Sequence, residues 1–116
     1  MNHFNYSAQF KKDLKRLTKR YRSLPKDLRR LEIFLEQYPS GVGASFTVLH
    51  RKSSVCIIKA RLACESLKAK SLRIIYAYIQ ESDSIEFVEI EFVELYFKGD
   101  KEREDKNRID SYLSGI

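Results

Sequence analysis

The sequence predicts an α+β fold in which a mostly antiparallel sheet is covered by an N-terminal helical hairpin. Apolar residues recur at helical spacing over residues 10–38, and from Val55 onward the spacing changes to two, as in a strand. Two later runs, 72–79 and 85–97, are rich in Ile, Val, Tyr and Phe and have the length of sheet-forming strands. The expected order is β-α-α-β-β-β-α. With 116 residues and 43% apolar content, the chain suits one domain, 1–116.

The N-terminal half predicts a short strand followed by two helices. Residues 4–6 form the opening strand, and Ser7 suits the N-cap of the first helix. Pro25 suits the first turn of the second helix, because its missing N–H would be unsatisfied there anyway. Residues 39–54, which contain Gly41 and Gly43, are expected to form a long connection. The predicted core stripes are Phe10, Leu14, Leu17 and Tyr21 in the first helix, and Leu28, Leu31, Phe34, Leu35 and Tyr38 in the second.

The alternation that starts at Val55 fixes the orientation of two cations. Cys56, Ile58, Ala60 and Leu62 point to one face of the strand. Lys59 and Arg61 therefore project together from the opposite face, about 7 Å apart along the strand. A polar connection over 63–71 follows and carries two further lysines, and Arg73 stands at the head of the next strand.

The last apolar run contains a near-repeat, Phe87–Glu91 followed by Phe92–Tyr96, after a turn predicted over 80–84. Its period of five is odd whereas strand alternation is even, so the two copies cannot face the same side of one regular strand. We therefore expect a bulge or a break between Glu91 and Val93. A charged segment then leads to a closing helix with a thin apolar stripe, Ile109, Tyr112 and Leu113.

Positive charge is concentrated near the N-terminus. The net charge is +6, yet residues 11–30 carry ten Lys or Arg and only Asp13 and Asp27 as acids, so that the rest of the chain is net negative. A basic face confined to one segment favours a phosphate-bearing partner such as RNA. The alternative is an ordinary solvated helix surface.

Several classes of protein find no support in the sequence. No apolar run approaches the roughly 18 residues that a membrane span needs, and the N-terminus lacks the layout of a signal peptide, so we expect a cytoplasmic protein with no membrane contact. Cys56 and Cys64 lack metal-ligand spacing and are expected to be structural thiols. His50 is expected to be a surface residue. We expect neither a metal nor a small-molecule cofactor.

Four stretches carry a resemblance to a known family. They are Phe10–Leu17, Lys59–Leu62, Ser71–Tyr76 and Leu95–Lys101, and together with the order of elements they span nearly the whole chain. In these features the chain resembles the RelE/ParE superfamily of toxins from type II toxin–antitoxin modules. The resemblance implies the RelE-like fold and, as partners, a small acidic antitoxin, the ribosome and mRNA.

The RelE branch implies a metal-independent, ribosome-dependent mRNA endonuclease that inhibits translation. In that reaction the 2′-hydroxyl of the substrate attacks the adjacent phosphate, which requires a proton acceptor, a proton donor and positive charge. By position in the motifs, Lys59 and Arg61 match a cationic pair and Arg73 matches the arginine at the scissile phosphate. The implied catalytic residues are Lys59, Arg61, Arg73, Lys98 and Lys101. The implied RNA-binding residues are Lys11, Lys12, Lys15, Arg16, Lys19, Arg20, Lys68, Lys70, Arg103 and Tyr112, with Tyr96 as the other candidate for stacking on a base.

The chain departs from the RelE pattern in lacking a histidine in its C-terminal segment. Two alternatives therefore stay open: a ParE-like toxin that inhibits gyrase without cutting RNA, and a non-catalytic basic RNA-binding module. For Lys59 and Arg61 the alternative to an active site is a solvated strand face. For Arg73 it is a salt bridge to Glu86, Glu89 or Glu94.

Overall fold

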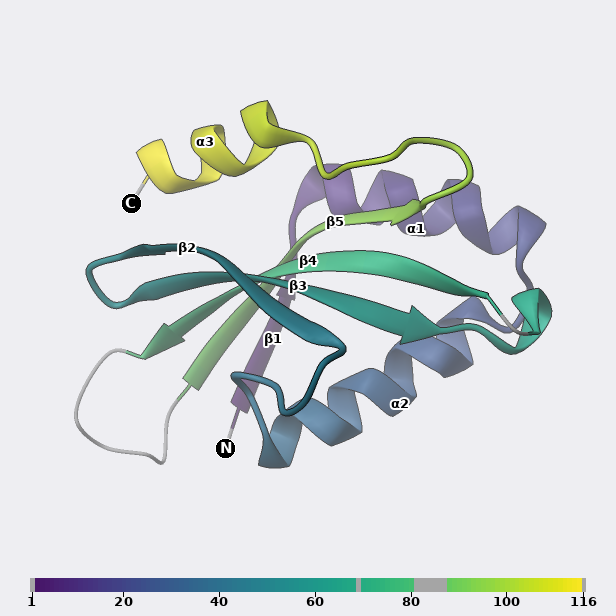
Figure 1. Ribbon diagram of the computed structural model, residues 1–116, viewed down its shortest axis with the longest axis horizontal. Helices are drawn as coiled ribbons and strands as arrows, with labels where there is room; N and C mark the ends of the chain where they lie inside the picture. The colour runs from purple at the N-terminus through teal and green to yellow at the C-terminus, as the bar shows by residue number, and fades with distance from the viewer. Residues whose placement is uncertain (1, 69, 81–87, 116) are drawn as a thin grey trace.

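Five strands form one sheet, in the order β1-β5-β4-β3-β2 (Figure 1). The computed structural model describes residues 2–68, 70–80 and 88–115, with only the backbone of residues 2, 3 and 88. β1 pairs with β5 in parallel, and the other pairs are antiparallel. The predicted α+β class is thus confirmed, with one more strand than expected. The elements are β1 (Asn2–Tyr6), α1 (Ala8–Arg20), α2 (Leu24–Gln37), β2 (Phe46–Lys52), β3 (Val55–Ala63), the 3-10 turn η1 (Glu65–Leu67), β4 (Ser71–Gln80), β5 (Val88–Phe97) and α3 (Lys106–Ser114).

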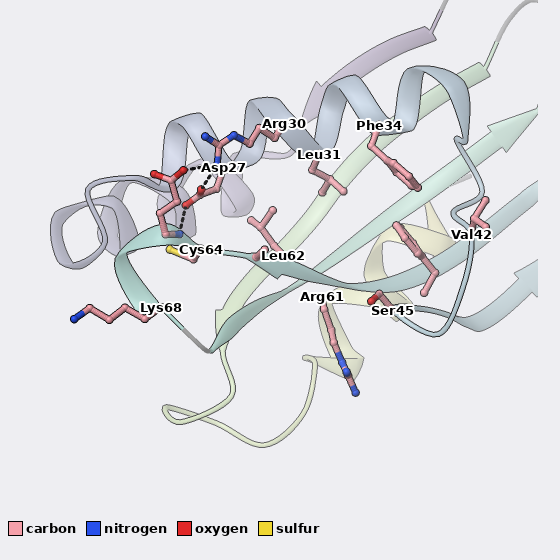
Figure 2. A pocket seen from close by; sticks show the side chains of 13 residues that line it. Asp27, Arg30, Leu31, Phe34, Val42, Ser45, Arg61, Leu62, Cys64 and Lys68 are labelled. Atoms are coloured by element: carbon pink, nitrogen blue, oxygen red, sulfur yellow. Dashed lines mark hydrogen bonds and ion pairs between the residues drawn. The ribbon is translucent and has the colours of Figure 1, made fainter.

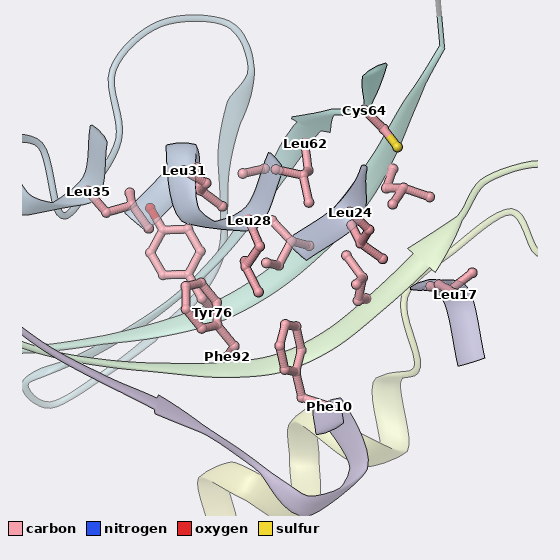
Figure 3. Close-up of a cluster of buried hydrophobic side chains, with 14 of the residues drawn as sticks. Phe10, Leu17, Leu24, Leu28, Leu31, Leu35, Leu62, Cys64, Tyr76 and Phe92 are labelled. Atoms are coloured by element: carbon pink, nitrogen blue, oxygen red, sulfur yellow. The ribbon is translucent and has the colours of Figure 1, made fainter. Parts of the chain in front are cut away.

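The two N-terminal helices cover one face of the sheet, as predicted. The Ser7 hydroxyl caps α1 by accepting a hydrogen bond from the backbone N–H of Phe10. Pro25 lies in the first turn of α2. Their apolar stripes pack on alternate residues of the strands and make the larger core (Figure 3). Its fully buried large side chains include Phe10, Leu17, Leu24, Leu35, Ile58, Ile74, Tyr76 and Phe92.

Two aromatic residues predicted in this core are exposed instead. Phe34 is 37% exposed and Tyr38 is 47% exposed, although Phe10 and Tyr21 are buried as expected. Phe34 lies at the border of the buried stripe of α2, next to fully buried Leu35, and Tyr38 is the C-cap residue that follows the last helical residue, Gln37. Helical spacing identified the side of the helix that faces the sheet, but not where the buried stripe ends.

The prediction of a continuous loop over residues 39–54 was wrong from Phe46 to Lys52. These residues form β2, which pairs with β3 through a bulge between Val48 and His50. β2 lies at the end of the sheet and most of its side chains are exposed, so it does not need the apolar alternation that marks an inner strand. His50 accordingly lies on a strand and not in a loop.

The opposite face of the sheet is covered in part by α3 (Figure 1). The smaller core, on this face, joins Ile109 and Leu113 of α3 to side chains of β3, β4 and β5.

A bulge in β5 allows side chains of this strand to reach the smaller core. At the bulge, Ile75 pairs with Glu94, whereas the next residue of β4, Tyr76, pairs with Phe92. The skipped residue is Val93, inside the predicted interval. The predicted turn over 80–84 and the start of the last strand lie almost entirely outside the described residues.

Charged groups fasten α3 to the rest of the chain. The Asp105 carboxylate accepts from the backbone N–H of Arg108 and caps the helix. The Arg108 guanidinium in turn donates to Asp13 of α1, at 2.5 Å. Across the described residues, no helix is long and apolar enough to span a membrane.

Candidate nucleic-acid interface

Arg61 and Arg73 face each other across two neighbouring strands. They are direct partners in the antiparallel pairing of β3 and β4, on the face that α3 partly covers. A hollow of about 520 Å³ opens beside them. We call it the cationic pocket; its lining is Arg61, Lys70, Ser71, Arg73, Phe97, Lys98 and Gly99, and no carboxylate of the described residues is among it. Directly opposed like charges destabilise a strand pair, so this arrangement favours a bound anion.

The Arg73 side chain is oriented by a neighbour on its own strand. Its guanidinium donates to the Ser71 hydroxyl at 2.8 Å and to the Ser71 carbonyl at 3.3 Å. Of the carboxylates considered as alternative partners, Glu89 accepts from Asn5, and Glu94 accepts from Lys101 and from a backbone N–H. Glu86 lies outside the described residues. Arg73 therefore keeps its charge available, which is the arrangement that an anion site needs.

Lys59, in contrast to Arg73, forms an ion pair with a carboxylate. Its ammonium donates to the Glu104 carboxylate at 2.9 Å, and both side chains are partly buried. Burial disfavours the charged form of Glu104, but the hydrogen bond and charge of Lys59 prevail and hold the pKa of Glu104 below its ordinary value. The three cations expected to converge are thus divided: Arg61 and Arg73 line the pocket, and Lys59 is neutralised beside it.

Lys98 and Lys101, both among the implied catalytic residues, lie in different settings. Lys101 donates to Glu94, a buried carboxylate that also accepts from the backbone N–H of Asp105 at 2.7 Å. Its ammonium also stands over the Tyr96 ring, 5.1 Å from the centroid. Lys101 therefore holds the segment between β5 and α3 in place. Lys98 instead is exposed and lines the cationic pocket.

The exterior of α1 is basic, as predicted. Lys11, Lys12, Lys15 and Lys19 are exposed. Arg16 lies 3.7 Å from Asp13, and Arg20 forms an ion pair with Asp100 at 2.6 Å. Because Asp100 belongs to the turn that carries Lys98, the Arg20–Asp100 pair brings the end of α1 to the rim of the cationic pocket.

The other predicted RNA contacts lie in different places. Lys70 lines the cationic pocket, Arg103 is exposed, and Lys68 borders a separate groove beside α2.

Of the two candidate tyrosines, only Tyr96 lies next to the pocket. It pairs with Arg73 across β4 and β5 and is buried. Burial, with the charges of Glu104 and Glu94, raises the pKa of Tyr96 to about 12, so its phenol stays protonated at neutral pH. Tyr112 lies on α3 in another hollow, where burial and then the charges of Glu91 and Glu89 raise its pKa to about 12.

Two residues that shape the site carry little signal in the sequence. Glu104 lies in a run of alternating charges, and Ser71 lies at the end of a polar connection. Glu104 has its role through Lys59, 45 positions away, and Ser71 has its role through Arg73, two positions along β4. The described residues contain no group of three or more His, Cys, Asp or Glu arranged to hold a metal ion.

The arrangement can bind a phosphodiester. Two guanidiniums can donate paired hydrogen bonds to phosphate oxygens and neutralise the charge that develops there in a transition state. The amines of Lys70 and Lys98 add positive charge and exchangeable protons at the edges of the pocket. Comparison of the chain with models of protein families, with curated proteins and with solved structures found no match.

Proposed function

We propose that this protein is the toxin of a type II toxin–antitoxin module, a RelE-like mRNA endonuclease that acts on the ribosome without a metal. The cationic pocket is the observation that carries the proposal, because Arg61 and Arg73 face each other there with Lys70 and Lys98 at its edges. The fold, with two N-terminal helices on a mostly antiparallel sheet, is compatible with this family. The partners in the proposal are an acidic antitoxin, the ribosome and mRNA.

The proposed reaction is an internal transfer within the RNA. The 2′-hydroxyl attacks the neighbouring phosphorus, the bond to the 5′-oxygen breaks, and the products are a 2′,3′-cyclic phosphate and a 5′-hydroxyl. Arg61 and Arg73 bind the phosphate and stabilise its developing charge. The 2′-hydroxyl proton goes to a base and the 5′-oxygen receives a proton, and the pocket amines that can exchange protons are those of Lys70 and Lys98. The lysines of α1 contact the RNA or ribosome backbone.

Expression in bacterial cells with primer extension on transcripts tests the proposal. The wild-type protein should arrest growth and leave new 5′ ends on translated mRNA. Arg73→Gln should lower cleavage by about 100-fold or more, since it removes a donor to the charged phosphate. Arg51→Gln is the matched control, because Arg51 is an exposed arginine of β2 that does not line the pocket. Intact transcripts in arrested cells would overturn the proposal, and DNA damage signalling in those cells would favour the gyrase-directed alternative.

One observation favours a second candidate, a basic RNA-binding module without catalysis. Lys59 is neutralised by Glu104, and neither a histidine nor a carboxylate of the described residues lines the cationic pocket. Such a module would bind RNA with an affinity that falls steeply with salt and would release no product. Incubating purified protein with labelled RNA on programmed ribosomes separates the two candidates, because only the nuclease yields 2′,3′-cyclic phosphate ends.

A further inference from the structure

One polar group beside the cationic pocket lacks a partner in the structure. The hydroxyl of Tyr96 is buried, and no described residue forms a hydrogen bond with it. The Tyr96 ring is held in place, because it is 3% exposed and the Lys101 ammonium stands over it. Buried hydroxyls nearly always have a hydrogen-bond partner, so an exception next to a binding pocket is a candidate for a functional role.

Strand pairing places Tyr96 one row from an ion pair. The residues directly across the sheet from Tyr96 are Arg73 and then Arg61. The Arg61 side chain points away from α2 (Figure 2), so all three side chains lie on the face that α3 partly covers. Lys59 belongs to the neighbouring row, about 7 Å along β3 from Arg61. Its ammonium donates to Glu104 at 2.9 Å, which places Glu104 over the row next to Tyr96.

Two carboxylates lie near the Tyr96 hydroxyl, and they differ in their hydrogen bonds. Burial raises the pKa of Tyr96 most, and the charges of Glu104 and then Glu94 raise it further, to about 12, so the phenol can donate at neutral pH. Glu94 is buried and accepts from Lys101 and from the backbone N–H of Asp105. Glu104 is partly exposed, and among the described residues Lys59 is the one side chain that donates to it. Glu104 is therefore the carboxylate that can change its partner.

The backbone around Glu104 does not have to move for such a change. Lys101, before Glu104, and the backbone N–H of Asp105, after it, both donate to Glu94 of β5. These two contacts hold the segment against the sheet on both sides of Glu104. A turn of the Glu104 side chain is then enough to bring its carboxylate from Lys59 to another donor.

We infer that Tyr96 is a positioning residue whose hydroxyl receives the Glu104 carboxylate when a phosphodiester enters the cationic pocket. The Tyr96 hydroxyl then donates a hydrogen bond to Glu104, and the Lys59 ammonium turns from Glu104 to the phosphate beside Arg61. In the free protein Lys59 is neutralised and the hydroxyl is unpaired, whereas in the bound state both have partners. This role rests on the proposed function, because it adds a third cation to the phosphate site proposed there.

The charges favour each arrangement in its own state. Without an anion, the Glu104 carboxylate is the nearest negative charge to Lys59, and the ion pair forms. The pair is partly exposed, so solvent weakens it, and a phosphate bound at Arg61 offers Lys59 a comparable partner. A carboxylate left without a donor in a partly buried place is unfavourable, and the Tyr96 hydroxyl removes that cost. The anion therefore shifts the population toward the second arrangement.

A double-mutant cycle on Tyr96 and Glu104 tests this role. The probe is a 2′-O-methyl RNA oligonucleotide, which cannot be cut because its attacking hydroxyl is blocked, and fluorescence anisotropy at low salt gives its affinity. Tyr96→Phe keeps the ring and should weaken binding about three- to tenfold in the wild-type background. In the Glu104→Gln background Lys59 is already released, so the same substitution should change binding by less than about twofold. Tyr78→Phe is the matched control, because Tyr78 packs against the larger core on the other face, and it should change binding by less than about twofold in both backgrounds.

Lys59→Gln provides a second readout. If Lys59 contacts a phosphate in the bound state, its loss should lower the slope of log affinity against log salt by about 0.7. Lys52→Gln makes the same charge change at an exposed position of β2 and should leave the slope unchanged. Urea unfolding shows whether each variant keeps its fold, and if Tyr96→Phe does not, the salt slope of Lys59→Gln decides.

An equal effect of Tyr96→Phe in both backgrounds, or an unchanged salt slope in Lys59→Gln, would overturn the role of Tyr96. The proposed nuclease is tested separately on programmed ribosomes. A wild-type protein that binds the oligonucleotide but yields no 2′,3′-cyclic phosphate ends would overturn the nuclease, and a non-additive cycle in that protein would still support the role of Tyr96.

Discussion

The hydroxyl of Tyr96 is buried without a hydrogen-bond partner among the described residues. It lies near charges of both signs: burial raises the pKa of Tyr96 most, the nearby carboxylates of Glu104 and Glu94 raise it further, and the guanidinium of Arg73 lowers it. An unsatisfied buried hydroxyl costs about 1–3 kcal/mol. The unpaired hydroxyl of Tyr96 therefore lowers the stability of the fold, and it lies next to the cationic pocket.

Replacing Tyr96 by Phe should stabilise the protein. The ring is kept and the unpaired hydroxyl is removed, so we expect the free energy of unfolding to rise by about 1 kcal/mol. Tyr6→Phe is the control with the opposite sign, because the Tyr6 hydroxyl donates to Glu32 at 2.5 Å. Urea unfolding measures both variants. A loss of stability in Tyr96→Phe as large as that in Tyr6→Phe would contradict the assignment of an unpaired hydroxyl.

At the scale of elements, the segment between β5 and α3 decides which cations are available. Three interactions hold this segment against the sheet. Lys101 donates to Glu94, Glu104 accepts from Lys59, and the backbone N–H of Asp105 donates to Glu94. Gly99 at its start has no room for a side chain, because a Cβ there would lie 2.3 Å from the Phe97 ring. This short segment therefore places Lys98 at the cationic pocket, whereas its Glu104 neutralises Lys59.

Glu104→Gln should strengthen anion binding. The substitution removes a negative charge and frees Lys59, so the affinity for a single-stranded RNA oligonucleotide at low salt should rise about three- to tenfold. Glu102→Gln changes the net charge equally two positions away in the same segment and is the matched control, because Glu102 is exposed. Anisotropy titration gives both affinities. Equal changes in the two variants would show that net charge alone acts.

The same pair gives a pH dependence of stability. Because the pKa of Glu104 is lowered in the folded protein, its contribution is present in full above the ordinary glutamate pKa, near 4.3, and is lost as the pH falls through the lower folded value. The difference in unfolding free energy between wild type and Glu104→Gln should thus be constant from pH 7 to pH 5 and shrink below pH 4. Urea unfolding of both proteins across this pH range measures the difference. A difference that grows toward low pH would contradict the prediction.

The basic face of α1 should act as a backbone contact and not as chemistry. Replacing Lys11, Lys15 and Lys19 with Gln should weaken RNA binding for all sequences and lower the slope of log affinity against log salt by about 2, since each phosphate contact on a single strand contributes about 0.7. The matched control carries the same charge change at three exposed cations on other elements, Lys26, Arg51 and Lys106. Equal slopes in the two triple variants would exclude a specific role for α1.

At the scale of the whole molecule, layers on both faces of the sheet are joined through a largely buried ion pair. Asp13 of α1 accepts from Arg108, which precedes the apolar stripe of α3, and from the backbone N–H of Leu95 in β5. α1 belongs to the larger core and α3 to the smaller one, so Asp13 connects elements that share no apolar cluster. These two partners, Arg108 and Leu95, lie more than 80 residues away in the sequence.

Asp13→Ala should destabilise the whole fold. Removing one member of a largely buried pair leaves the Arg108 guanidinium uncompensated, and we expect a loss of about 3 kcal/mol. Asp110→Ala is the control, because Asp110 is exposed on α3, and should change the free energy of unfolding by less than about 0.5 kcal/mol. In a double-mutant cycle, Arg108→Met should recover part of the loss in the Asp13→Ala background. Strict additivity of the two substitutions would exclude a direct pair.

Much of the fold is encoded in local spacing. Helical stripes, strand alternation and the Ser7 cap depend on residues within a few positions of one another, so the order of helices and inner strands was readable from the sequence. The odd period of the near-repeat required a bulge, which lies at Val93. β2 was missed because an edge strand packed on one side carries little apolar pattern. The exposure of Phe34 and Tyr38 was missed because it depends on how much of the helix surface the neighbouring elements cover.

The sequence by itself determined the α+β class, the basic exterior of α1, and the common strand face of Lys59 and Arg61. Only the tertiary structure decided which cations remain without a carboxylate. Lys59 is paired with Glu104, 45 positions away, whereas Arg61 meets Arg73 across the sheet with no carboxylate in the lining of their pocket. The physical reason is that the charge available at a site depends on distances through space, and those follow from strand pairing and from the path of the segment before α3.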